Sequence, residues 1–139
     1  MDWLKIAKKA EAYLKKGDLG TCEKLIVSSL DAHKSSPFHI ATQLGFTNPP
    51  EMVASDIDAF IQMQKKSFGV KAVYAELNGF DNNPDNWHYD LFAYKIYGGN
   101  EEYDWLAEWD SDDYVGLALT GMEALQDVYS ADTLSDEAS

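Results

Sequence analysis

The fold of this chain depends on one stretch, residues 70–114, which reads VKAVYAELNGFDNNPDNWHYDLFAYKIYGGNEEYDWLAEWDSDDY. Eleven of the chain's eighteen aromatic residues lie in this stretch, together with eleven of its twenty-four carboxylates. Only one lysine, Lys95, accompanies the carboxylates between Glu76 and Asp113. A segment that is both aromatic and acidic predicts the sheet of the fold and also its most distinctive surface.

The stretch predicts an antiparallel meander. Its strands, recognised by alternation and by β-branched and aromatic content, are expected at residues 70–77, at residues 87–97 and from 101 or 102 to 110, with a short fourth strand at 115–119. Residues 79–86 form a polar loop, and Gly98-Gly99-Asn100 predicts a hairpin. A loop of two or four residues in that hairpin keeps the carboxylates of the third strand away from the aromatic layer, so we expect an even loop.

This register divides the side chains between two faces of the sheet. The aromatic face is the expected core, packed under the helices, and it consists of Phe92, Tyr94, Ile96, Tyr103, Trp105 and Trp109. The opposite face is acidic and also carries tyrosines. We expect a partner to bind there, through Tyr89, Tyr97, Glu102, Asp104, Glu108 and Asp110.

Helices are expected both before and after the strands in chain order. Asp2 and Thr21 predict the starts of the first two, Ser36-Pro37 that of a short third, and Asn48 that of a longer fourth. The buried stripe of the fourth helix is expected to be Val53, Ile57, Phe60, Ile61 and Gln64. Thr120-x-x-Glu123 resembles a capping box and opens a C-terminal helix.

Together these elements predict an α+β fold with about four N-terminal helices packed on a three- to four-stranded antiparallel meander, followed by a C-terminal helix. We expect one domain over residues 1–130 and a flexible acidic tail over residues 131–139.

Two short segments resemble known helical motifs. The run AEAYLKKGDLGTCEKLI resembles one tetratricopeptide-type hairpin, but no second copy occurs at a period near 34, so we expect an ordinary pair of helices. The run IATQLGFTNPPEMVASDIDAF resembles the helix-turn-helix of some transcription activators. Its second helix carries Glu51, Asp56 and Asp58 with no basic residue before Lys65, which would repel DNA phosphates.

The charge of the chain is strongly asymmetric. Residues 1–75 carry ten lysines against eight carboxylates, whereas residues 76–139 carry one lysine against sixteen, and there is no arginine. Nucleic-acid binding is therefore not expected, and the C-terminal half favours a basic partner. Acidity that serves only solubility is the alternative. The lack of a long apolar run, of a secretory signal and of a second cysteine predicts a cytoplasmic protein without a membrane span.

The sequence offers little for catalysis, and we expect no enzyme, no cofactor and no metal. His88 and Asp90 share a strand face, where a satisfied core histidine is expected, and Cys22 lies on an apolar helix stripe, where an inert thiol is expected. The loop from Asp81 to Asp85 spaces its oxygen ligands like the start of a calcium loop but lacks the glycine and glutamate that such loops require, and the acidic cluster at 110–113 is a similarly weak candidate.

Two functional hypotheses follow. The first is a non-enzymatic interaction module that binds a basic protein surface, similar in composition to small cytosolic inhibitors and to bacterial immunity proteins. The alternative is a small-ligand or cation-binding domain that uses residues 81–85. A homodimer through the mixed acidic face also remains open.

Overall fold

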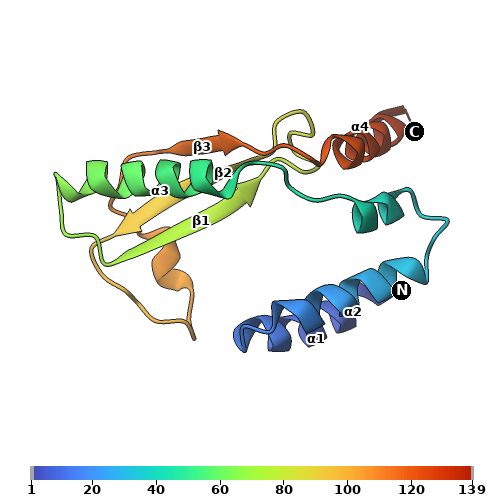
Figure 1. Cartoon of the computed structure of the whole chain (residues 1–139), viewed down its shortest axis with the longest axis horizontal. Helices are drawn as coiled ribbons and strands as arrows, with labels where there is room; N and C mark the ends of the chain where they lie inside the picture. The colour runs from blue at the N-terminus through green and yellow to red at the C-terminus, as the bar shows by residue number, and fades with distance from the viewer. Residues whose placement is uncertain (1, 139) are drawn as a thin grey trace. The chain divides into compact units, whose positions relative to one another are not determined.

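The computed structural model describes residues 2–138, with side chains as far as residue 131. It confirms the α+β class, with helices before a three-stranded antiparallel sheet and a helix after it (Figure 1). The contacts within the chain group into two compact units, Met1–Gly45 and Phe46–Ser139. The expected single domain over residues 1–130 stays a prediction. The flexible tail expected over residues 131–139 lies almost wholly outside the residues whose side chains are described.

The first unit contains α1 (Trp3–Lys15), α2 (Leu19–Asp31) and the 3₁₀ helix η1 (Pro37–Gln43). Asp2 caps α1 as expected, by accepting a hydrogen bond from the backbone N–H of Lys5. Helix α2 begins two residues before the expected Thr21. The reason is that Asp18 is the cap, and its Oδ1 accepts from the N–H of Thr21 at 3.1 Å.

The second unit begins with α3 (Pro50–Lys65), whose start corrects one expectation. Asn48 does not cap this helix. Its side chain donates to the carbonyl of Ala118 at 2.9 Å and accepts from the N–H of Thr120 at 2.9 Å, so it ties the approach to α3 to the end of the third strand. A side chain that satisfies backbone groups 70 and 72 residues away cannot be recognised from local spacing.

The sheet consists of β1 (Ala72–Asn78), β2 (His88–Tyr94) and β3 (Val115–Ala118), in that spatial order. The prediction of a strand over residues 101–110 is wrong. That segment is a loop containing a short 3₁₀ helix, η2 (Asp104–Ala107), and the third strand is the one expected as the fourth. The backbone N–H of Ala93 bonds to Oγ of buried Ser111, and the carbonyl of Ala93 accepts from the N–H of Asp110. This part of the edge of β2 is therefore filled by residues 110–111.

Helix α3 covers the sheet face that was expected to be open. The core consists of Phe60 from the helix with Tyr89, Leu91 and Ala93 from β2, each at most 4% exposed. The expected stripe of α3 is confirmed, because Val53, Ile57 and Ile61 pack against this cluster and Gln64 is buried.

The prediction that the aromatic face lies under the helices is wrong, because α3 covers the opposite face of the sheet. Of that set Tyr94 alone is buried, whereas Ile96, Tyr103 and Trp109 are 76%, 55% and 43% exposed. The even positions of β2 include His88 and Asp90 as well as rings, and dehydrating these polar groups under a helix would cost free energy that Leu91 and Ala93 do not cost.

The C-terminal helix α4 (Glu123–Ala138) is present but begins three residues after the expected cap, Thr120, and the expected capping box does not form, because the hydroxyl of Thr120 bonds to that of Thr47 at 2.8 Å and its N–H donates to Asn48. The carboxylate of Glu123 accepts a hydrogen bond from the N–H of Gly121 at 2.9 Å and so satisfies a backbone donor just before the helix. Leu125 is buried, and Gln126 donates to the carbonyl of Pro84 at 2.9 Å. These contacts hold the start of α4 against the 79–86 loop.

Candidate partner-binding site

The segment between β2 and β3 forms a loop of the Ω kind, residues 95–110, which we call the acidic loop. Its two ends lie side by side, because the backbone N–H of Lys95 donates to Oδ2 of Asp110 at 2.7 Å. The N–H of Asp110 in turn donates to the carbonyl of Ala93 at 3.0 Å. The acidic loop therefore leaves and rejoins the sheet at one place, and contains η2 (Figure 1).

Trp105 anchors the acidic loop to the sheet. Its indole Nε1–H donates to the carbonyl of Gly99 at 3.0 Å, and its ring packs edge-on against Tyr94 with centroids 4.9 Å apart. The hydroxyl of Tyr94 donates to the carbonyl of Leu106 at 2.8 Å. Gly98 lies directly against the indole, since a Cβ at that position would be 2.3 Å from Cγ of Trp105. These contacts give the loop a defined conformation.

The outer surface of the acidic loop combines carboxylates with large apolar side chains. Ile96, Tyr97, Tyr103 and Trp109 are all more than 40% exposed. The exposed carboxylates among them are Glu101, Glu102, Asp104, Glu108 and Asp110. Tyrosine and tryptophan are enriched at protein interfaces, where they supply contact area at low conformational cost. This surface therefore has both the charge and the anchors that a binding site needs.

Five of the six residues expected to bind a partner lie together on the acidic loop: Tyr97, Glu102, Asp104, Glu108 and Asp110. The sixth, Tyr89, does not join them. It is 4% exposed and belongs to the core beneath α3, so we leave it out of the candidate site. Asp110 also has a structural part, because its carboxylate accepts the N–H of Lys95 at the base of the loop.

Sequence reasoning missed the exposed rings of Tyr103 and Trp109 and the exposed side chain of Ile96. The alternation of residues 101–110 hides them because it is that of a strand, whereas η2 covers only Asp104–Ala107 and ends before Trp109. Gly98-Gly99 before this segment favours a loop.

A second polar cluster lies between α3 and the sheet. Asp56 accepts hydrogen bonds from the hydroxyls of Tyr89 at 2.5 Å and Tyr114 at 2.6 Å. Burial, together with the bond to Asp56, raises the pKa of Tyr89 to about 12. The hydrogen bond to Asp56, together with burial, also raises the pKa of Tyr114. Both phenols therefore stay protonated at neutral pH and act as donors that hold the helix on the sheet.

The loop over residues 79–86, which contains the candidate cation site, is stabilised by hydrogen bonds between its own backbone groups. The N–H of Asn83 donates to the carbonyl of Gly79 at 3.0 Å, and the N–H of Asn86 to the carbonyl of Asn83 at 3.1 Å. In the part of the chain with described side chains, no group of three histidine, cysteine or acidic side chains is placed to hold a metal ion. Cation binding by residues 81–85 stays a prediction.

His88 and Asp90 lie on the same face, as their spacing predicts. Nε2 of His88 is 3.5 Å from Oδ2 of Asp90, and its Nδ1 is 3.1 Å from the carbonyl oxygen of Asn86. Both ring nitrogens thus have polar neighbours, as expected for a satisfied histidine. The ring lies on the sheet face opposite α3 and not in the core.

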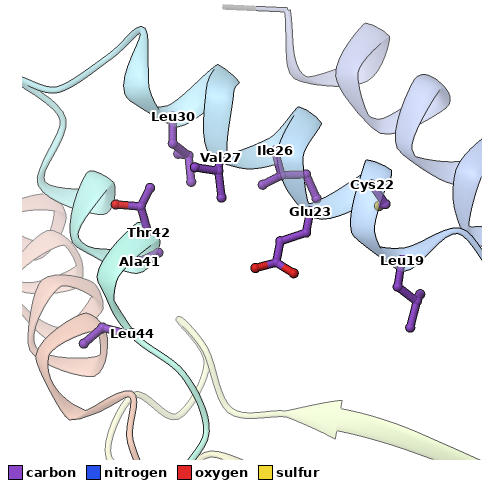
Figure 2. A pocket seen from close by; sticks show the side chains of 9 residues that line it. All are labelled: Leu19, Cys22, Glu23, Ile26, Val27, Leu30, Ala41, Thr42 and Leu44. Carbon is purple, nitrogen blue, oxygen red and sulfur yellow. The ribbon is translucent and has the colours of Figure 1, made fainter.

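The first unit has an apolar hollow of its own, of about 440 Å³, between α2 and η1. Figure 2 shows Leu19, Glu23 and Ile26 pointing into it from α2 and Leu44 bordering it from the chain after η1. Cys22 also lines the hollow and is 5% exposed, so its thiol is buried as the sequence indicates.

No helix within residues 2–138 combines the length and the apolarity that crossing a bilayer requires. Comparison with protein-family models, with curated proteins and with solved structures found no match to this chain. The functional argument therefore depends on the acidic loop itself.

Proposed function

We propose that this chain is a non-enzymatic interaction module of the cytoplasm, whose acidic loop binds a basic surface of another protein. The observation that supports this function best is the exposure of Ile96, Tyr97, Tyr103 and Trp109 among five carboxylates. The carboxylates attract a basic partner and increase its association rate, and the exposed rings supply the buried contacts that slow its dissociation.

The anchoring of the acidic loop strengthens this proposal. Binding costs free energy whenever side chains or loops must be ordered at the interface. The bonds from Trp105 to Gly99 and from Tyr94 to Leu106 order the loop before any partner arrives. More of the contact energy is then available for affinity.

The charge of the acidic loop also decides against two other occupants. Nucleic acid presents phosphates that the carboxylates would repel. In a two-fold homodimer formed through the loop, each subunit would contribute the same patch, so carboxylates would face carboxylates. Sedimentation at increasing protein concentration checks this, and we expect a monomer.

The deciding experiment is capture from native lysate at low salt, followed by elution with salt. The variant Asp104→Lys/Glu108→Lys reverses two exposed charges on the acidic loop. We expect it to lose the captured protein, and we expect the wild-type complex to weaken steeply with salt because exposed charges are screened over about 8–10 Å.

The matched control is Asp81→Lys/Asp85→Lys, which makes the same change of net charge on the loop of the alternative hypothesis. It should capture the partner as well as the wild type does. If the two variants behaved alike, total charge and not the acidic loop would be responsible, and the proposed site would be abandoned. Loss of capture by the control alone would move the site to residues 81–85.

A further inference from the structure

A pocket of about 370 Å³ lies beside the acidic loop, on the sheet face opposite α3, and its size falls within the range of about 300–1,000 Å³ that is usual for ligand sites. Its lining residues are Asp90, Phe92, Trp109, Asp113, Tyr114 and Val115. Trp109 belongs to the acidic loop as well, so the pocket and the proposed binding surface are continuous.

Two aromatic rings form one wall of the pocket. The rings of Phe92 and Trp109 are tilted by 58° with centroids 4.9 Å apart, and Tyr74 stacks behind Phe92 with centroids 6.0 Å apart. Trp109 is 43% exposed although its neighbours hold it in place. Exposed indole faces attract cations through the negative potential of the ring.

Two carboxylates complete the lining, and one of them is already oriented. Asn78 donates to Oδ2 of Asp90, and His88 approaches the same oxygen at 3.5 Å. Oδ1 of Asp90 receives no hydrogen bond from the described side chains, and this carboxylate is 22% exposed. Asp113, at the other side, is exposed. The adjacent pocket under the acidic loop includes Lys95, whereas no lysine lines this one.

We infer that this pocket takes the guanidinium group of one arginine of the basic partner. The inference rests on the proposed function and deepens it. A guanidinium is planar and weakly hydrated, so it stacks on Trp109 while its N–H groups bond to Asp90 and Asp113. A lysine ammonium is a compact, strongly hydrated charge that matches this combination less well.

The composition of the chain identifies the source of the arginine. Residues 1–139 contain none, so these residues of a second copy cannot supply the group. An arginine on the surface of a different protein is the occupant that agrees with the proposed function. That source also agrees with the charge argument against a homodimer through the acidic loop.

The test titrates the full chain with three blocked tripeptides, acetyl-Gly-X-Gly-amide, in which X is arginine, lysine or citrulline. Citrulline has nearly the shape of arginine without its charge. The readout is the indole N–H resonance of Trp109, assigned by comparison with Trp109→Phe. We expect the arginine peptide to shift this resonance saturably and to bind about tenfold or more tightly than the citrulline peptide, with lysine between them. Equal binding of arginine and citrulline would overturn the inference.

A pair of matched variants locates the effect. Asp113→Asn removes one charge from the pocket without changing its shape and should weaken the arginine peptide about tenfold, whereas Asp58→Asn removes the same charge from the exposed side of α3, on the other face of the sheet, and should change binding by less than about twofold. Equal effects of the two substitutions would refute the pocket assignment.

The inference and the proposed function fail in different ways. If the tripeptides do not bind but lysate capture still depends on Asp104 and Glu108, only the arginine pocket is wrong. If the arginine tripeptide binds at Trp109 but lysate capture is unaffected by reversing Asp104 and Glu108, the pocket stands and the acidic loop loses its proposed function.

Discussion

The hydroxyl of Tyr89 donates a 2.5 Å hydrogen bond to Oδ2 of Asp56, and this bond joins β2 to α3. Oδ1 of the same carboxylate accepts a 2.6 Å bond from the hydroxyl of Tyr114, which precedes β3. One side chain on the helix thus contacts both the central strand and the approach to an edge strand. Because Tyr89 is buried and Tyr114 half-buried, each hydroxyl depends on Asp56 as its acceptor.

The substitution Asp56→Asn should destabilise the second unit. An amide offers one oxygen as acceptor and an NH₂ group that only donates, so one tyrosine hydroxyl loses its partner. We expect a loss of about 1–3 kcal/mol in the free energy of unfolding, measured in urea. Asp58→Asn, an exposed change two residues along the same helix, should stay within about 0.5 kcal/mol of wild type.

The shifted pKa of Tyr89 predicts how stability depends on alkaline pH. In the unfolded chain tyrosine loses its proton near pH 10, whereas Tyr89 in the fold keeps it until about pH 12. Between these values the folded state binds more protons than the unfolded state, so the free energy of unfolding falls as pH rises from 10 to 12. Urea unfolding across this range should show the decline, and Tyr89→Phe should reduce its slope. An unchanged slope in that variant would contradict the assignment.

Two helix starts and one buried helix face follow from local chemistry. Asp2 and Ser36 accept backbone N–H groups within three residues of themselves, so the spacing that predicts these caps is also the geometry that forms them. The stripe of α3 is equally visible in the sequence, since Val53, Ile57 and Phe60 repeat at helical spacing. Such features need no knowledge of distant contacts.

The sheet face that α3 buries is predicted by the positions of the charged side chains and not by the sizes of the rings. Strand β2 carries apolar side chains on both faces, and the even face with Phe92 and Tyr94 has the larger rings. That face also holds His88 and Asp90, and the odd face contains no charged group. Avoiding the dehydration of a carboxylate outweighs the gain from burying a larger ring, so charge and not ring size predicts the side that α3 covers.

The loop between β2 and β3 could not be predicted from alternation. Residues 101–110 alternate acidic and aromatic side chains as a strand does, but the backbone partners of Ala93 are Asp110 and Ser111. A serine hydroxyl that replaces a strand partner leaves no periodic signal. Five of the six residues that the sequence indicates for partner binding nevertheless lie on this loop, because carboxylates such as Asp104 and Glu108 must stay hydrated whether their backbone is strand or loop.

Replacing Trp105 by alanine should release the acidic loop without unfolding the sheet. The change removes the bond to Gly99 and the packing on Tyr94. We expect faster hydrogen exchange at the amides of Leu106 and Glu108, which bond within η2, and unchanged exchange at Leu91 in β2. Hydrogen exchange measured by mass spectrometry, with resolution of the amides over residues 91–110, tests both expectations.

The same substitution at Trp109 provides the control for this experiment. Trp109 packs on Phe92 but is 43% exposed, and its indole makes no hydrogen bond among the described residues. Trp109→Ala should therefore leave exchange at Leu106 and Glu108 close to that of wild type. If both variants loosened η2 to the same extent, Trp105 would not be the anchor.

Gly116 in β3 lies against the ring of Tyr89, and this contact predicts a steric effect. A Cβ at Gly116 would be 2.0 Å from Cε2 of Tyr89, whose ring cannot move away without giving up its bond to Asp56. Gly116→Ala should cost about 1–3 kcal/mol of unfolding free energy, as overpacking of a core does. Gly69→Ala in the same unit meets nothing within 4 Å and should be neutral or stabilising by up to about 1 kcal/mol. Urea unfolding of both variants separates the two cases, because a general effect of adding a methyl group would shift them alike.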